Sequence, residues 1–247
     1  MNETALITIV HDPEGINIPF YKIVKDRLKD LYSELYITVS EESSQELRLQ
    51  LENNSFRIKT IPKKGVTHAR HEVLNFGMSG NNQYYHYCDF DRLLTWAIKY
   101  PQELQRIVED IPNYHYTVFG RTERAFYTHP LEWTETEKIS NKVFSLEFGQ
   151  DMDITAGSCS FSKQAGEYLI KYSRDKMTDA EWPMIIHKIG KLRVNYKAVE
   201  GLEYQEEISG HNETANEADK WFGRLNLCYI ICESAIKANR EYGIINP

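Results

Sequence analysis

The sequence predicts an α/β fold with a largely parallel central sheet. Short runs of β-branched and aromatic residues alternate along the chain with segments whose apolar residues recur at helical spacing, as in successive βαβ units. The length of 247 residues suits one α/β domain, which we expect to cover residues 1–247. A hydrophobic fraction of 41% is enough for a sizeable core.

The predicted strands are short apolar runs bounded by turn residues. The first is LITIV, which HDPEG ends, and a later one, QYYHYCDFD, ends in two aspartates. The strands are expected at residues 6–10, 36–40, 56–62, 83–91, 114–121 and 192–204.

The predicted helices lie between these strands. Pro101 suits the first turn of a helix, and Thr134 with Glu137 could form a capping box. The helices are expected at residues 17–35, 43–53, 67–80, 92–100, 101–111, 128–148, 163–173, 178–190 and 216–243. The apolar face of the first would contain Phe20, Ile23, Val24, Arg27, Leu28, Leu31 and Leu35. That of the last would contain Trp221, Leu225, Cys228, Ile231, Cys232, Ala235 and Ile236. Residues 153–162 read as a small, polar loop.

The charge balance limits the classes of partner. A net charge of −7 and a pI of about 5.7 disfavour binding to nucleic acid through its phosphates. Neither an export signal nor a membrane-spanning segment is evident, so we expect a cytoplasmic protein with reduced cysteines.

The motif Asp89-Phe90-Asp91 follows a tyrosine-rich strand. If the backbone stays extended through Phe90, both carboxylates face one point, where they would repel unless a cation lies between them. Mg²⁺ or Mn²⁺ prefers such oxygen ligands and completes its shell with water and phosphate oxygens. The alternative is that both aspartates cap the helix that begins near Arg92.

The sequence before this motif adds a family resemblance. KKGVTHARHEVLNFGMSGNNQYYHYCDFD resembles the segment of GT-A fold glycosyltransferases that runs from a basic, glycine-containing loop through an Ala-Arg helix to the acidic triplet. The matching residues are Gly65, Ala69, Arg70, Asp89 and Asp91. The match is partial, because His71 stands for the family's Asn and Val73 for its Gly.

The resemblance implies a nucleotide-sugar site with a UDP- or GDP-sugar as donor. It assigns Asp91 to the metal, Asp89 to the ribose or the same metal, Arg70 to the nucleotide and Asp12 to the nucleotide base. The alternative for Arg70 is a solvated helix face. For Asp12 it is a turn that needs no ligand.

Further roles are implied for the second half of the chain. Gly157 would lie in a loop that contacts the sugars, Asp179 or Glu181 would be the catalytic base of an inverting transfer, and Trp182 would face the sugar ring. His211 would be an additional metal ligand. The alternative for Asp179 and Glu181 is that they are acidic residues of the kind that ordinarily begin a helix. A retaining reaction would need no such base. The alternative for His211 is an exposed loop histidine without a ligand.

The fold implied by the resemblance is a GT-A-like domain with a mostly parallel or mixed sheet and a C-terminal amphipathic helix. Residues 1–110 would bind the nucleotide, residues 111–205 the acceptor, and residues 206–247 would form a helical extension. The expected function is metal-dependent glycosyl transfer to an unknown acceptor. A nucleotidyltransferase, a haloacid-dehalogenase-type phosphatase and a non-catalytic nucleotide-binding protein remain alternatives, and the oligomeric state is open.

Overall fold

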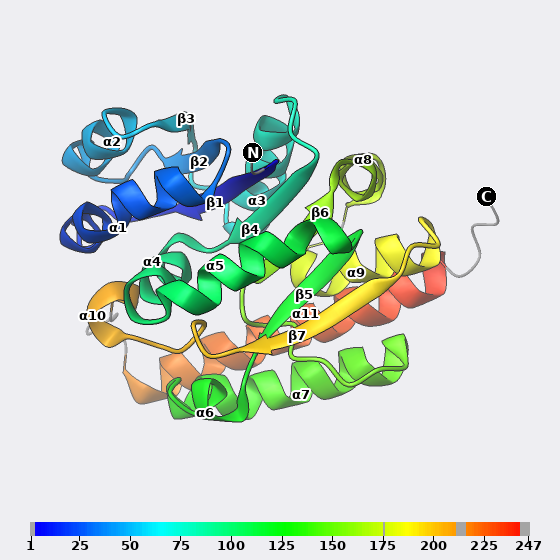
Figure 1. Cartoon of the computed structure of the whole chain (residues 1–247). Coiled ribbons are helices and arrows are strands. Elements are labelled where there is room, and N and C mark those ends of the chain that lie inside the picture. Colours follow the sequence, from blue (N-terminus) through cyan, green and yellow to red (C-terminus); the bar gives the residue numbers. More distant parts are fainter. Residues whose placement is uncertain (1–2, 175, 211–215, 243–247) are drawn as a thin grey trace.

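One sheet of seven strands runs through both predicted halves of the chain. The computed structural model describes residues 3–174, 176–210 and 216–242. The strands lie side by side in the order β3-β2-β1-β4-β6-β5-β7 (Figure 1). They are β1 (Thr4–Val10), β2 (Leu35–Ser40), β3 (Phe56–Ile61), β4 (Tyr84–Cys88), β5 (Tyr116–Arg121), β6 (Ser158–Ser162) and β7 (Val194–Val199). All the predicted strands are present, and β6 is an addition.

Strand β6 lies within the segment that the sequence suggested was a loop. It pairs antiparallel with both β4 and β5, whereas every other pair of neighbouring strands is parallel. All of its residues are buried, because its small serine and cysteine side chains fit between large neighbours and Ser158 donates a hydrogen bond to the Tyr87 carbonyl at 3.0 Å. The reversal places the start of β6 beside the carboxyl end of β4, where Ser158 pairs with Cys88.

The helices follow the predicted order closely. Pro101 begins a new helix after α4, as its fixed φ favours. The helical elements are α1 (Ile18–Leu31), α2 (Gln45–Glu52), α3 (Val66–Met78), α4 (Phe90–Lys99), α5 (Pro101–Asp110), η1 (Ile111–Asn113), α6 (Glu123–Phe126), α7 (Leu131–Phe148), α8 (Lys163–Tyr172), α9 (Thr178–Lys188), α10 (Glu206–Ser209) and α11 (Glu217–Tyr242).

Helices cover both faces of the sheet and form two cores. Helices α1, α2, α4 and α5 supply the core on one face, and α3, α8, α9 and α11 supply the core on the other (Figure 1). Helix α7 packs against α11, on the side away from α1 and α2. Both faces of the central strands are therefore shielded, which leaves their ends as the place for a site.

Two details of the helix predictions are wrong. Helix α1 buries Ile18, Tyr21, Val24 and Leu28, whereas Ile23 is 66% exposed, so the apolar face is rotated from the predicted one. Thr134 does not cap a helix, because α7 begins at Leu131, three residues earlier. Its hydroxyl donates to the Leu131 carbonyl within the helix.

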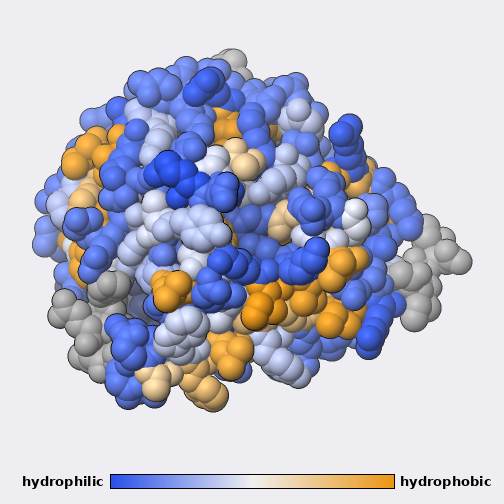
Figure 2. All heavy atoms as spheres, turned by 90° about the horizontal axis from the view of Figure 1, so that it is seen from below, coloured by the Kyte–Doolittle hydropathy of each residue, from blue (hydrophilic) through white to orange (hydrophobic). Residues whose placement is uncertain are grey.

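The predicted apolar face of α11 is buried only in part. Cys228, Ile231 and Ala235 are buried, but Trp221 and Leu225 are 38% and 56% exposed. The view from below shows apolar patches on an otherwise hydrophilic face (Figure 2). Exposed large apolar side chains of α7 and α11 are Leu131, Ile139, Leu146, Trp221, Phe222, Leu225 and Tyr229. None of the helices in the described ranges is long and apolar enough to span a bilayer.

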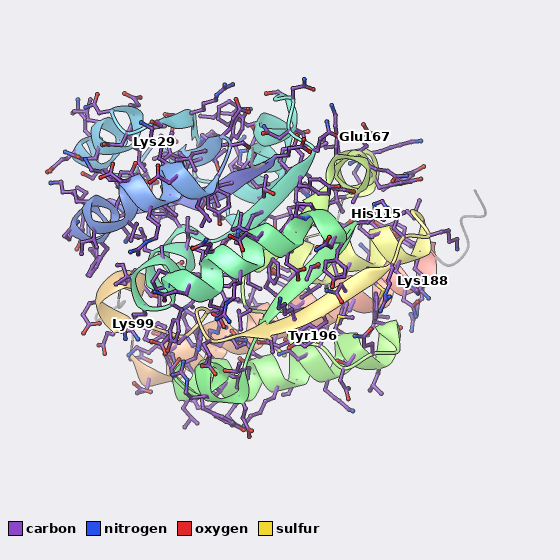
Figure 3. All side chains as sticks on the ribbon, viewed as in Figure 1. Lys29, Lys99, His115, Glu167, Lys188 and Tyr196 are labelled. Atoms are coloured by element: carbon purple, nitrogen blue, oxygen red, sulfur yellow. The ribbon has the colours of Figure 1, made fainter. Side chains whose placement is uncertain are left out.

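The segment after β7 is held against α4. The carboxylate of Glu203 is buried and accepts hydrogen bonds from Lys99 at 3.1 Å and from the Tyr100 hydroxyl at 2.8 Å. Lys99 lies at the end of α4 near this segment (Figure 3). These contacts fix Tyr204, which lies next to the candidate site.

The unpredicted strand supplies a test of the fold. Phe161 of β6 is fully buried and stacks on Tyr85 with ring centroids 5.4 Å apart. Phe161→Ala should therefore lower the free energy of unfolding by about 3–5 kcal/mol. The measurement is chemical denaturation, with Leu146→Ala as the control, because Leu146 is 69% exposed. Equal losses for the two variants would contradict this placement of β6.

Candidate functional site

A cleft of about 230 Å³ lies at the edge of the sheet where β4 ends and β6 begins. Parallel strands end at the same edge, and the reversed β6 starts there, so side chains from distant segments meet at this point. The cleft is lined by the predicted site residues Arg70, Asp89, Asp91 and Asp179, and also by Arg92 and Arg224.

Asp89 is held in place by contacts from three elements. Its backbone N–H donates to the Gly157 carbonyl at 3.0 Å, its carboxylate accepts from the Tyr87 hydroxyl, and Arg70 Nη2 lies 3.1 Å from Oδ2. It precedes α4 but makes no capping hydrogen bond to that helix, which counts against the cap alternative. Burial raises the pKa of Asp89, although the Arg70 charge opposes this shift.

Asp91 reaches the same cleft by a different route from the predicted one. The backbone does not stay extended through Phe90, because α4 begins at that residue and Asp91 lies in its first turn. The carboxylate is 29% exposed and is 3.9 Å from Arg92 Nε. Asp89 and Asp91 therefore line the same cleft, but Asp89 directly precedes α4 and Asp91 lies within it. They do not project from one face of a strand, as the sequence analysis expected.

The acidic residues of the cleft fit a divalent metal ion whose remaining ligands are water and the phosphate oxygens of a substrate. Within residues 3–174, 176–210 and 216–242, no group of three His, Cys, Asp or Glu side chains is arranged to hold a metal alone. Mg²⁺ and Mn²⁺ do not need such a group, because one or two carboxylates together with phosphate oxygens and water complete the shell. Asp89 and Asp91 are the two carboxylates in the cleft that would fill this role. His211, the predicted additional ligand, lies outside the described residues.

Arg70 is buried between two carboxylates. Nε donates to the Tyr87 hydroxyl at 2.8 Å, Nη1 to Thr178 Oγ1 at 3.0 Å and to Asp179, and Nη2 to Asp89. Only 5% of the residue is exposed, so the solvated-face alternative is wrong. Burial disfavours its charge, but Asp179 and Asp89 outweigh this effect and raise the pKa of Arg70. Four of its five N–H bonds are thus engaged within the protein.

Asp179 lies in the first turn of α9, and its side chain is 10% exposed. It lines the cleft and forms an ion pair with Arg70 of α3, which also pairs with Asp89 at the end of β4. The ordinary role of an acidic residue at a helix start is therefore combined here with a specific partner.

Glu181 and Trp182 lie away from the cleft. Glu181 is fully buried, where it accepts hydrogen bonds from Ser173, from the Arg174 backbone at 2.7 Å and from Tyr242 at 2.8 Å. Trp182 is 2% exposed, donates to Ser173 at 3.1 Å and borders a water-sized cavity of about 20 Å³ that Arg70 also lines. Both contribute to the core, and neither is placed to meet a sugar.

Asp12 and Gly157 shape the backbone at this edge. The Asp12 carboxylate is buried and accepts from the backbone N–H groups of Ile16 and Asn17, both at 2.9 Å, so it organises the turn before α1. This arrangement favours the turn alternative. Gly157 has a φ of +73°, and a Cβ there would collide with Asp89 Oδ2. Glycine is therefore required for both conformation and space.

A second, mostly apolar cavity adjoins the cleft. It has a volume of about 260 Å³ and lies at the ends of β1, β2 and β3. Val66 lines both cavities, and Val10, Ile61 and Ala69 provide apolar surface in the second. Its volume and mostly apolar lining suit an aromatic ring next to the acidic pair.

The sequence analysis missed a buried ion network behind the cleft. Arg121, at the end of β5, contacts Asp153 and Glu137, each at 2.8 Å, and Arg224 of α11 also pairs with Glu137. Burial opposes the charge of Asp153, but Arg121 holds the pKa of this carboxyl well below its usual range. A charged residue at the end of a predicted buried strand was the available signal for Arg121. Nothing local indicated Arg224, which comes from the last helix.

Comparison with known proteins identifies the fold. No protein-family model matches the sequence, and no curated protein sequence matches it significantly. The chain is similar in structure to glucosyl-3-phosphoglycerate synthase from Mycobacterium tuberculosis, with a TM-score of 0.59, 12% identity, and coverage of 99% of this chain and 81% of the other. A structure of that enzyme with Mn²⁺, UDP-glucose and phosphoglyceric acid has a TM-score of 0.53 and 11% identity, and the match covers 99% of this chain and 80% of the other.

Mannosyl-3-phosphoglycerate synthase from Rubrobacter xylanophilus is also similar, with a TM-score of 0.56 and 12% identity over 99% of this chain and 76% of the other. At such low identity these similarities establish the fold alone. The chain therefore has the GT-A fold, as the sequence resemblance predicted, with β6 as its reversed strand.

The contact between Gly157 and Asp89 can be tested with a matched pair of variants. Gly149 also has a positive φ, of +88°, but a Cβ there meets nothing within 4 Å. Gly149→Ala should cost about 1–2 kcal/mol of stability from backbone strain alone. Gly157→Ala should cost at least about 1 kcal/mol more, because it also displaces Asp89. Chemical denaturation measures both, and equal costs would contradict the packing of Gly157 on Asp89.

Proposed function

We propose that this chain is a metal-dependent glycosyltransferase that moves a sugar from a nucleotide diphosphate to an acceptor. The observation that carries the proposal is the position of Asp89 and Asp91 in a cleft that adjoins an apolar cavity at the ends of β1 to β3. A nucleoside in that cavity would direct its diphosphate toward the two carboxylates. The GT-A fold supports the same arrangement.

UDP-glucose and Mn²⁺ are the first donor and metal to test, because structures of the same fold contain them. A GDP-sugar and Mg²⁺ remain part of the proposal. The donor base would lie near Val10 and Ala69 rather than on the Asp12 carboxylate, whose two oxygens already accept backbone hydrogen bonds.

Each residue of the cleft has a distinct proposed role. Asp91, with Asp89, would hold the metal, which supplies neutralisation of charge on the leaving diphosphate. Arg70 would position Asp89 rather than contact phosphate, since most of its N–H groups are engaged. Asp179 stays the proposed base for an inverting transfer, and the Arg70 ion pair would orient it.

The rival functions are less well supported. A haloacid-dehalogenase-type phosphatase has its acidic motif on the first strand, whereas here the motif follows β4. A nucleotidyltransferase would have a glycine-rich, basic loop after β1, where this chain has HDPEG. A non-catalytic nucleotide-binding protein would bind UDP with Mn²⁺ but would neither transfer nor hydrolyse the sugar of any donor.

The metal assignment predicts a specific loss of binding. Asp91→Asn should weaken Mn²⁺-dependent UDP binding at least about tenfold, because it removes a charged ligand from the ion. Isothermal titration calorimetry with UDP, in the presence and absence of Mn²⁺, measures this. Asp30→Asn makes the same chemical change at an exposed position on α1 and should bind as the wild type does. Unchanged binding by Asp91→Asn would refute the metal assignment, and GDP with Mg²⁺ is titrated in parallel.

The role of Asp179 can be separated from that of a simple partner for Arg70. If Asp179 is the base, Asp179→Asn should lower kcat about 10²–10⁴-fold and leave the affinity for UDP and Mn²⁺ unchanged. If it only balances the Arg70 charge, kcat should fall less than about tenfold. In either case the variant should lose about 3–5 kcal/mol of stability, because it breaks the buried ion pair with Arg70. Steady-state kinetics distinguish the two roles, and chemical denaturation checks the loss of the ion pair.

A further inference from the structure

One wall of the cleft contains two arginines, Arg92 and Arg224, whose guanidinium groups lie over the ring of Trp133. We call these three residues the cationic wall. Arg92 follows Asp91 on α4, Trp133 lies on α7 and Arg224 lies on α11. The Arg224 guanidinium is 4.1 Å from the centre of the Trp133 ring, and that of Arg92 is 5.7 Å from it. Tyr204 also lies 5.6 Å from Arg92. These aromatic rings hold both guanidinium groups beside the acidic pair.

The charges of this region do not balance at the wall. Arg121 and Arg224 are matched by the carboxylates of Glu137 and Asp153. Among the described residues, the one carboxylate within 4.0 Å of the Arg92 guanidinium is that of Asp91, at 3.9 Å, which is longer than a hydrogen bond. If Asp91 binds a divalent ion, Arg92 is left with a positive charge that its surroundings do not neutralise.

The wall also contains unused hydrogen-bond donors. Arg92 is only 7% exposed, yet the described part of the chain offers its Nη1 no acceptor, and the same holds for Nε of Arg224. Leaving a buried donor unpaired costs about 1–3 kcal/mol, and more for a charged group. Two such donors on neighbouring arginines that line one cleft indicate a ligand with oxygen acceptors and negative charge.

We propose that the cationic wall binds an anionic group of the acceptor, either a phosphate or a carboxylate. This inference rests on the proposed function, because the acceptor must enter the cleft beside the donor. In the transfer, a hydroxyl oxygen of the acceptor bonds to the anomeric carbon and the bond from that carbon to the diphosphate breaks. The hydroxyl proton passes to a base or to water, and the nucleoside diphosphate leaves. The wall would orient the acceptor for this attack through its anion.

Three small probes of similar size separate charge from shape. Glycerol 3-phosphate carries a phosphate, glycerate carries a carboxylate, and glycerol is neutral. Each is titrated by calorimetry into wild-type protein saturated with UDP and Mn²⁺, so that the donor site is already filled. We expect one or both anions to bind at least tenfold more tightly than glycerol, and the stronger anion identifies the class of acceptor. Equal binding of all three, or none by any, would overturn the proposal.

Variants of α11 and α4 then localise the binding. Arg224→Gln should weaken binding of the preferred anion at least tenfold, and it should fold because Glu137 keeps its contact with Arg121. Arg92→Lys keeps the charge but removes donors, so a smaller loss is expected. Arg240→Gln makes the same change as Arg224→Gln at an exposed position of the same helix and should have no effect. Circular dichroism checks the folding of each variant, and wild-type affinity in Arg224→Gln would refute the site.

The anion site can also be tested if the protein does not bind a nucleotide donor. If wild-type protein does not bind UDP with Mn²⁺ or GDP with Mg²⁺, the three probes are titrated into the protein alone. Binding of an anion that Arg224→Gln abolishes would still support the cationic wall as an anion site. Absence of such binding would overturn it independently of the donor.

Discussion

The guanidinium of Arg70 is the contact on which this site depends. The carboxylates of Asp89 and Asp179 carry like charges at the same cleft, and a cation that contacts both of them offsets their repulsion. Arg70 provides that cation and a fixed geometry, because its planar group engages both carboxylates, Tyr87 and Thr178 at once. The end of β4 and the start of α9, which lie about 90 residues apart in the chain, are thereby held together.

The reversed strand β6 provides the second constraint. A parallel strand in its position would bring its last residue to the cleft, whereas the antiparallel β6 brings its first residue and the glycine before it. The Gly157 carbonyl can then accept from the Asp89 backbone, and its missing side chain leaves room for the Asp89 carboxylate. Asp89 and the loop before β6 are therefore held against each other, which is the kind of support that a binding site on loops requires.

The order of the elements could be predicted from the sequence, because apolar periodicity reports burial directly. The strand β6 could not, because its serines and cysteine are buried only through packing against β4 and β5, which is a tertiary effect. Among the site residues, Asp89, Asp91, Arg70 and Asp179 do line the cleft, as a family motif suggested. Glu181 and Trp182 differ from their neighbour Asp179 only in which side of α9 they occupy, and the motif does not specify that. Arg224 was missed because its partner Glu137 is 87 residues away.

The two sides of the cleft come from parts of the sequence that are far apart. Asp89 and Asp91 directly follow β4, and Gly157 directly precedes β6, so the pairing of β6 with β4 brings them together. Arg224 is added only by α11, the final helix of the structure. During synthesis, the residues of the acidic edge therefore leave the ribosome well before the helix that faces them. A chain shortened before residue 217 would retain both candidate metal ligands but would lose Arg224, Leu227 and Ile231 from the lining of the cleft.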